Sequence, residues 1–373
     1  MSTVHVDLSE LVRAPLRSGI QRIEREAIRH WPGPAALVPC MVGADGSWRR
    51  LPDSCLEILC GDASPEAVTQ EAERLTDCIA ASTPLPDGQI ARLLNLELFY
   101  GVERAEAHLR LAAAGTPVLW YVYDFIPFLR PDLFPQGTTR QCMHYLRGLL
   151  GIGERLAFLS QATRQDHARR IGRAAVDDMP IISPGADGLG LERQTFDPSR
   201  RDFVALGTVE PRKNPDALLR AFESLWQSGV EAPLIVAGRI DSGAAYANWF
   251  FAHHRGNPLL RVLEQPSDAA VRELLRGARA LVMPSEAEGF GLPPYEAAHC
   301  GIPAIASAML PCAPLIANGA TLLPRMDQAA IADAVRGMMD DARAAAMWRA
   351  ASNLTLPGWR DFGASLGGWA QQR

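Results

Sequence analysis

Two glutamates, Glu288 and Glu296, flank a glycine-rich turn in the stretch SEAEGFGLPPYE, residues 285–296. Glycines in such a turn permit a positive φ and let backbone amides approach a ligand closely. The two prolines suit the first turn of a helix, so Glu296 is expected in or near that turn, where free amides attract an anion. The carboxylates would then accept hydrogen bonds from ligand hydroxyls, although Glu296 could serve only as a partner of the helix dipole. The amides in question belong to Gly289, Phe290, Gly291 and Leu292.

A second candidate is the stretch LGTVEPRKN, residues 206–214. A predicted strand ends at Gly207, Thr208 opens a short loop, and a helix is expected to follow. Doubly wound sheets bind ligands at the carboxyl ends of their strands. Arg212 and Lys213 lie in this loop, and a planar guanidinium beside a compact ammonium suits a diphosphate. Lys213 is the only lysine among 37 basic residues, and a solvated basic loop is the alternative interpretation.

Short β-rich runs alternate with helical patterns along the chain, which is typical of parallel α/β layers. Strands are predicted at residues 4–8, 118–123, 156–160, 203–207, 234–238, 280–284, 304–307 and 321–323. Helices are predicted at residues 20–30, 103–114, 139–150, 162–171, 214–226, 268–276, 294–300 and 327–339. Residues 179–200 are rich in Pro, Gly and Asp and are interpreted as a linker. Two α/β domains would place a ligand cleft between them.

Composition and charge argue against several classes of protein. The net charge of −5 is not that of a nucleic-acid-binding chain. No apolar run approaches the roughly 18 residues of a membrane helix, and the first residues lack the apolar core of a signal peptide. A cytoplasmic location is therefore expected. The seven cysteines include no CxxC pair, which argues against zinc. No G-x-G-x-x-G follows the first strand, which argues against a nicotinamide-dependent oxidoreductase.

The block from Glu288 to Glu296 resembles the E-x7-E signature of retaining glycosyltransferases of family 4. The resemblance covers nearly the whole chain in the right order. It includes SPGAD (residues 183–187), LGTVEPRKN (206–214), LIVAGR (234–239) and CGIPAIAS (300–307). Two further stretches, SGIQR (18–22) and YDFIPFLRPDLFP (123–135), resemble the branch that contains bacterial polysaccharide mannosyltransferases.

This resemblance implies an α/β protein with the GT-B fold, in which two Rossmann-like domains face a central cleft. Residues 1–185 would form the acceptor domain, and residues 186–357 would form the domain that binds the nucleotide-sugar donor. Residues 358–373 would form a C-terminal helix that packs back on the N-terminal domain.

The resemblance also assigns roles by position. Glu296 would bind the ribose of the donor, and Glu288 would contact hydroxyls of the transferred sugar near the reacting carbon. The diphosphate would be held by the amides of residues 289–292 and by Gly207, Thr208, Arg212 and Lys213. The nucleobase would be lined by Arg239, Leu263 and Glu264.

In the N-terminal domain, Gly19 would close over phosphate or sugar, and Asp124 would face the acceptor or the sugar. Two residues depart from the family pattern. Many relatives have Arg at the place of Thr208, and Arg212 is expected to supply the missing charge. Many relatives also have His at the place of Tyr123, and a tyrosine does not titrate near neutrality.

No Asp-x-Asp triplet occurs, so a metal-clamped diphosphate is not indicated, and the expected ligand is the donor itself with no separate cofactor. The resemblance favours GDP-mannose as donor and a hydroxyl of a glycan or lipid-linked saccharide as acceptor. A UDP-sugar, GDP-fucose, or a non-catalytic partner that binds sugar nucleotides stays open. Arg22, Arg25 and Arg29 fall on one helix face. That face could meet an anionic lipid-linked acceptor in peripheral contact with the inner membrane, or it could be a solvated, salt-bridged face.

Overall fold

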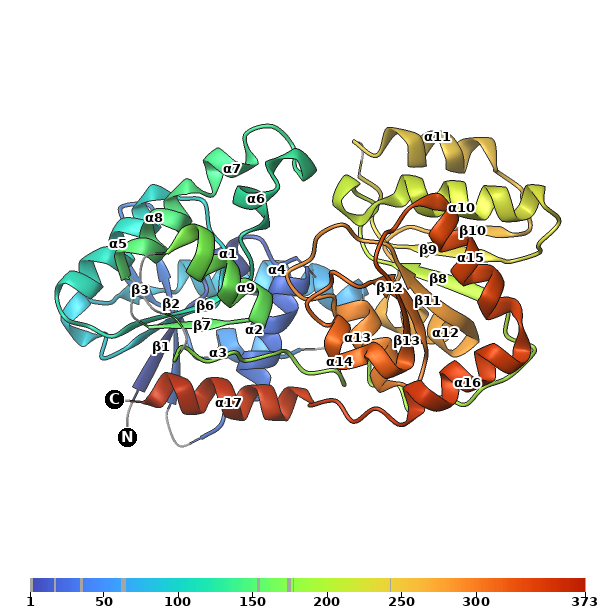
Figure 1. Ribbon diagram of the computed structural model, residues 1–373. Coiled ribbons are helices and arrows are strands. Elements are labelled where there is room, and N and C mark those ends of the chain that lie inside the picture. Colours follow the sequence, from blue (N-terminus) through green and yellow to red (C-terminus); the bar gives the residue numbers. More distant parts are fainter. Residues whose placement is uncertain are drawn as a thin grey trace. The chain divides into compact units, whose positions relative to one another are not determined.

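The computed structural model describes residues 3–16, 18–33, 36–61, 65–152, 155–172, 176, 178–241 and 243–372. The chain divides into two compact units, drawn in Figure 1. Unit 1 comprises residues 1–185 and 357–373, and unit 2 comprises residues 186–356. Within the described residues, no helix combines the length and apolarity that a membrane crossing requires.

Unit 1 contains a seven-stranded sheet in the order β4-β3-β2-β1-β5-β6-β7. Its strands are β1 (Thr3–Asp7), β2 (Ala36–Val42), β3 (Trp48–Arg50), β4 (Thr83–Pro84), β5 (Leu93–Asn95), β6 (Val118–Val122) and β7 (Leu156–Phe158). The five strands β2-β1-β5-β6-β7 are parallel, and β3 and β4 add an antiparallel edge. Strands β5, β6 and β7 are buried throughout, as expected for a parallel sheet covered on both faces.

The helices of unit 1 cover both faces of this sheet. They are α1 (Ser9–Arg13), α2 (Gly19–Arg29), α3 (Ser54–Leu59), α4 (Pro65–Ala80), α5 (Val102–Ala113), α6 (Ile126–Leu129), α7 (Thr138–Gln141), α8 (Met143–Ile152), α9 (Gln161–Asp166) and α17 (Trp359–Gln371). Helices α5 and α8 lie on one side of the sheet, and α17 lies on the other side, against α2 (Figure 1). Ring contacts between Tyr121 and Phe362, with centroids 5.8 Å apart, join α17 to the sheet.

Unit 2 contains a six-stranded parallel sheet in the order β10-β9-β8-β11-β12-β13. Its strands are β8 (Asp202–Leu206), β9 (Leu234–Ala237), β10 (Leu260–Leu263), β11 (Ala278–Met283), β12 (Ala304–Ser307) and β13 (Ala320–Leu323). Its helices are α10 (Pro215–Gln227), α11 (Ala245–His253), α12 (Asp268–Gly277), α13 (Leu292–His299), α14 (Ala313–Ile316), α15 (Gln328–Met339) and α16 (Asp341–Ser352). The chain runs outward from β8 to β10 and then returns to β11 on the other side of β8. The strand order therefore reverses between β8 and β11.

The predicted strands are all present, within a few residues of the expected bounds. The predicted helix at residues 139–150 is instead split into α7 and α8, with Cys142 between them. The predicted helix at residues 162–171 becomes a π-helical turn after Asp166. Helix α13 begins at Leu292 and not at Pro294 as predicted. The reason is that prolines fit the first helical turn, whose N–H groups have no intrahelical acceptor.

Candidate functional site

The loops that follow β8 and β11 lie side by side at the reversal of strand order in unit 2. A backbone hydrogen bond of 2.9 Å from Glu286 N to Arg212 O joins them. In open α/β sheets this is the position at which ligands bind, because the two neighbouring connections leave in opposite directions. The two candidate stretches of the sequence therefore form one site.

The β8 loop is shaped by residues with unusual backbone conformations. Gly207 has a φ of 114°, and a side chain there would collide with Nζ of Lys213. The loop then forms a 3-10 turn at Pro211–Lys213. Asn214 has a φ of 54° and a ψ of 46° immediately before α10, and its Nδ2 donates to the carbonyl of Met326 at 2.8 Å. This conformation places Lys213 over the end of β8.

Glu288 lies between the two cations of the β8 loop. One of its carboxylate oxygens is 2.6 Å from an Arg212 terminal nitrogen, and the other is 3.8 Å from Nζ of Lys213. The hydroxyl of buried Ser285 donates to the carboxylate at 3.0 Å. Burial opposes ionisation, yet the charges of Lys213 and Arg212 outweigh it and hold the pKa of Glu288 below its ordinary value. Glu288 is therefore a carboxylate at neutral pH.

Arg212 has a second carboxylate partner, Glu210, at 2.7 Å. The side chains of Arg212 and Lys213 are only 21% and 18% exposed. These paired, half-buried cations are not the solvated loop tip that was the alternative interpretation. Sequence reasoning passed over Glu210 and Ser285, although both lie inside the candidate stretches. Glu210 could have been recognised from the sequence, because it is an acid in the same short loop as the two cations.

Helix α13 begins after a turn that only glycine fits. Gly291 has a φ of 99°, and a side chain there would come within 2.8 Å of Cys312 Sγ. Phe290 is 4% exposed and packs edge-to-face against the ring of Tyr295, with centroids 5.0 Å apart. Glu296 is the fifth residue of the helix, in its second turn, and is 3% exposed. It is therefore too far along the helix to be a simple partner of the dipole end.

The three residues expected to line a nucleobase lie at the ends of β9 and β10. The amide of Val209 donates to the carbonyl of Arg239 at 2.7 Å, and the amide of Gly238 donates to the carbonyl of Leu263 at 3.0 Å. The carboxyl ends of β8, β9 and β10 are thus tied together. The side chains of Arg239 and Glu264 are exposed, and Leu263 is half-buried.

The two candidate residues of unit 1 occupy the starts of helices. Gly19 is the exposed first residue of α2, and the Ser18 side chain caps this helix by accepting from Gln21 N at 3.3 Å. Asp124 follows β6, and its carboxylate accepts from Ile126 N at 3.0 Å at the start of α6. Their roles toward a donor or acceptor stay predictions.

Tyr123, at the position where a histidine was expected, is buried. Its hydroxyl donates to the carbonyl of Leu96 at 2.6 Å, and the hydroxyl of Thr163 donates to the Tyr123 carbonyl at 2.8 Å. Burial raises the pKa of Tyr123 well above its ordinary value. This side chain therefore joins β6 to its neighbours and does not act as a base.

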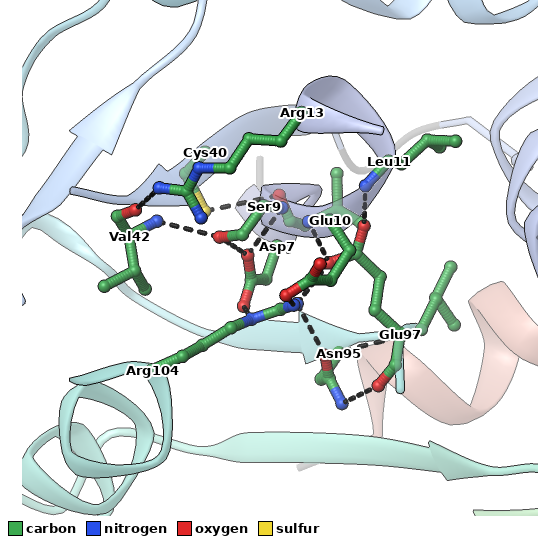
Figure 2. A network of polar contacts seen from close by, with 12 residues as sticks. Asp7, Ser9, Glu10, Leu11, Arg13, Cys40, Val42, Asn95, Glu97 and Arg104 are labelled. Atoms are coloured by element: carbon green, nitrogen blue, oxygen red, sulfur yellow. Dashed lines mark hydrogen bonds and ion pairs between the residues drawn. The ribbon is translucent and has the colours of Figure 1, made fainter. Parts of the chain in front are cut away.

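A buried charged network lies at the strand reversal of unit 1, between β1 and β5 (Figure 2). Arg104 of α5 donates through Nε to Asp7 at 2.6 Å and also pairs with Glu97. Glu97, just after the neighbouring strand β5, in turn accepts from the amides of Glu10 and Leu11 at 2.9 and 2.7 Å and so caps α1. Each buried charge is thus met by an opposite charge or by amides, as burial requires.

His108 completes this network in a neutral form. Its Nδ1 accepts from Trp120 Nε1 at 3.0 Å, so its Nε2 donates to Asp7 at 2.7 Å. Burial lowers the pKa of His108, in agreement with the neutral ring. Glu24 of α2 lies within the field of the same network, and burial raises its pKa well above the ordinary value. Sequence reasoning missed these residues. Asp7, an acid at the end of an apolar strand, could have indicated a buried charged group at this place.

The basic face expected on the first helix is not a continuous exposed surface. Arg25 is 4% exposed and pairs with buried Glu71. Arg29 pairs with Glu26, and Arg22 is half-buried. Arg25 therefore lies neither on a solvated salt-bridged face nor on a face that could contact a membrane. Among the described residues, no group of three or more His, Cys, Asp or Glu side chains could hold a metal ion.

Residues 191–354 match the family model described as glycosyl transferases group 1. The serotype-specific mannosyltransferase WbdA of Escherichia coli is 30% identical over 214 residues, which cover 52% of this chain and 26% of that protein. The O-antigen chain mannosyltransferase B of Escherichia coli is 32% identical over 145 residues, 36% of each chain. The chain therefore matches well under half the length of these relatives. The family match contains both loops of the candidate site.

A crystal structure of Alr3699/HepE from Anabaena, in complex with UDP and glucose, is similar to this chain. Its TM-score is 0.67 at 14% sequence identity, and the likeness covers 99% of both chains. Sucrose-phosphate synthase from Thermosynechococcus elongatus gives a TM-score of 0.66 at 14% identity. These likenesses establish the fold, which is GT-B, and confirm the predicted fold class.

Proposed function

We propose that this chain is a retaining glycosyltransferase that moves a hexose from a nucleotide diphospho-sugar to a hydroxyl of a saccharide acceptor. One observation carries this proposal: Arg212 and Lys213 meet the carboxylate of Glu288 at the strand reversal of unit 2. Two cations suit a diphosphate, and a carboxylate beside them suits the hydroxyls or the developing charge of the sugar. The match of residues 191–354 to group 1 glycosyl transferases supports the same activity.

In this proposal the donor lies along the carboxyl ends of β8, β9, β10 and β11. Lys213, Arg212 and the amides that precede α13 hold the diphosphate. Glu296 binds the ribose, and the ends of β9 and β10 at Arg239 and Leu263 contact the base. The turn at Gly291, whose φ of 99° favours glycine, supports this arrangement, because a residue without a side chain lets backbone amides approach a ligand closely.

The reaction would break the bond between the sugar C1 and the diphosphate oxygen and form a bond from C1 to the acceptor oxygen. The departing diphosphate takes the proton of the acceptor hydroxyl, so charge and atoms balance without a further reactant. Arg212 and Lys213 stabilise negative charge as it grows on the diphosphate. Glu288 remains ionised and stabilises positive charge at C1. Acceptor attack on the face that the diphosphate leaves would retain the configuration at C1.

We further propose GDP-mannose as the donor and a glycan or lipid-linked saccharide as the acceptor. The support is the similarity to two Escherichia coli mannosyltransferases, which covers 52% and 36% of this chain. A metal-independent reaction and a cytoplasmic location belong to the same proposal, and so does a peripheral contact with the inner membrane that would not use Arg25, which is buried. A UDP-sugar or GDP-fucose as donor is the alternative.

A thermal-shift screen of nucleotide diphospho-sugars tests the donor. A ligand at ~100 times its dissociation constant should raise the free energy of unfolding by about 2.7 kcal/mol. We expect the largest shift with GDP-mannose, in the presence of EDTA as well as without it. A larger shift with a UDP-sugar would show that the donor is that UDP-sugar and not GDP-mannose. No shift with any sugar nucleotide would contradict the proposed activity.

A further inference from the structure

The two cations of the candidate site are already balanced by two carboxylates. Arg212 contacts Glu288 through one terminal nitrogen, at 2.6 Å, and Glu210 through the other, at 2.7 Å. Lys213 lies 3.8 Å from Glu288. The four side chains are 11–23% exposed, so water screens these contacts only in part. The cluster is therefore close to neutral before any anion binds.

A diphosphate that uses Arg212 fully must replace one of these carboxylates. A guanidinium binds a phosphate most strongly through two parallel N–H donors. The two terminal nitrogens of Arg212 are occupied by different acids, so a phosphate can form such a pair only when one acid withdraws. An anion that arrives while both acids stay would also meet two negative charges at short range.

Glu210 is the acid that is held less firmly. Glu288 is held by three side chains, since Arg212, Lys213 and Ser285 all contact its carboxylate. Glu210 makes its ion pair with Arg212, and no second ion pair to its carboxylate is present within the described residues. Its side chain is also 23% exposed, against 11% for Glu288, so its carboxylate can turn toward water.

We propose that Glu210 is an internal counter-ion that occupies Arg212 when the donor is absent and yields that position to the diphosphate of the donor. This inference rests on the proposed function, because it concerns the same diphosphate site. Glu210 thereby lowers the affinity for every diphosphate, including the nucleoside diphosphate product, and so limits how tightly the product is retained. Glu210 acts by competing with the diphosphate for Arg212 and is not itself a catalytic residue.

The test is calorimetric titration of inorganic pyrophosphate, GDP and UDP into the full chain and into the variant Glu210→Gln. Removal of one negative charge at this distance should tighten binding about five- to tenfold. The affinity of the variant should also fall more steeply with added salt, because its cations lack an internal partner. Glu231→Gln is the matched control. Glu231 is exposed just before β9, at the amino ends of the strands and away from the carboxyl ends that form the site, and its loss should change affinity less than about twofold.

Glu210→Ala provides a second variant, and circular dichroism establishes that each variant is folded. Binding by Glu210→Gln and Glu210→Ala that is equal to or weaker than wild type would overturn the inference, because Glu210 would then only orient Arg212. A companion variant, Lys213→Ala, separates this outcome from failure of the proposed function. Should the wild type bind no diphosphate, or Lys213→Ala bind as well as wild type, the site assignment and the inference would both fall.

Discussion

Two hydrogen-bond donors and a lysine ammonium surround the carboxylate of Glu288, and this fixes what the residue can do. Arg212, Lys213 and Ser285 all contact it, and its pKa lies below the ordinary value of a glutamate. A group with such a pKa holds no proton to donate at neutral pH, so Glu288 is not a general acid. Its fixed negative charge instead suits stabilisation of a positively charged transition state.

Glu24 is a second glutamate whose surroundings shift its pKa, and they raise it, whereas those of Glu288 lower it. It is 1% exposed, and its Oε2 has no hydrogen-bond partner among the described residues. Burial raises the pKa of Glu24, and the negative charge of Glu97 raises it further. The charges of Arg104 and Arg25 lower it by less. The neighbouring acids are Glu97, whose pKa burial raises to about 7, and Asp7, which stays ionised. Burial and the charge of Glu97 therefore favour the protonated form of Glu24 in the folded protein.

This proton makes the stability of unit 1 depend on pH. An unfolded glutamate loses its proton above pH ~4.3, whereas folded Glu24 keeps its proton to a higher pH. Above pH ~4.3 the folded state therefore binds more protons than the unfolded state does. The contribution of Glu24 to the free energy of unfolding should therefore fall as pH rises from about 5, by about 1.4 kcal/mol per pH unit for its one proton. Glu97, whose pKa is also raised, adds a fall of its own, so Glu24→Gln should make the slope less steep without abolishing it, as measured by urea unfolding at several pH values.

Glu73→Gln is the control for this experiment, since Glu73 is an exposed residue of α4 in the same unit. It should keep the slope of the wild type. A Glu24→Gln variant with an unchanged slope would show that Glu24 is ionised in the folded protein, and the account of the buried network would be wrong.

At the scale of elements, the site depends on close approach between the ends of neighbouring strands. Gly207 lies under Lys213, and a side chain at Gly238 would collide with the carbonyl of Gly207. Each of these glycines has a positive φ, of 114° and 154°. The ends of β8 and β9 are therefore packed too tightly for any other residue, and this packing sets the height of Lys213 above the sheet.

Gly207→Ala should weaken donor binding roughly tenfold, since the new methyl group displaces the Lys213 ammonium and the backbone is strained. Gly229→Ala is a matched control, because Gly229 has a φ of 79° but open space around it. Both variants should lose stability, and only Gly207→Ala should lose affinity for a nucleoside diphosphate in a calorimetric titration. Equal affinities in the two variants would contradict the role given to this packing.

The sequence predicted the elements of unit 2 better than those of unit 1, for a physical reason. Strand ends with glycine and charged residues mark the β8 and β11 loops, and both candidate stretches proved to be adjacent. The region of residues 33–86 carries short strands at the sheet edge, including the antiparallel pair β3 and β4. Its Pro, Gly and Ser content hid that pattern. The buried network could not be predicted, because Asp7, Glu97 and Arg104 meet only through the fold.

At the scale of the whole molecule, the C-terminal helix completes unit 1 and not unit 2. Residues 357–373 group with residues 1–185. Helix α17 approaches α2 so closely that a side chain at Gly363 would collide with the carbonyl of His30. Arg92 also donates to the carbonyl of Ala370. The end of the chain is therefore part of the core that supports β1 and α2.

A pair of glycines in α17 tests this role. Gly363→Ala should destabilise unit 1 by about 1–3 kcal/mol, because the methyl group meets backbone that cannot move aside. Gly368→Ala in the same helix faces open space, and it should stabilise the helix by up to about 1 kcal/mol. Chemical denaturation of the full chain measures both changes. Equal effects from the two substitutions would show that α17 does not pack as described.

The central claim is that Glu288, Arg212 and Lys213 form the centre of a sugar-transfer site. The most direct measurement is the rate at which the purified chain releases nucleoside diphosphate from GDP-mannose and other sugar nucleotides, with a saccharide acceptor present. We predict turnover by the wild type and a loss of at least about 100-fold in kcat for Glu288→Ala. Lys213→Ala should raise the donor concentration needed for half-maximal rate. Full activity in both variants, or no turnover by the wild type with any sugar nucleotide, would contradict the claim.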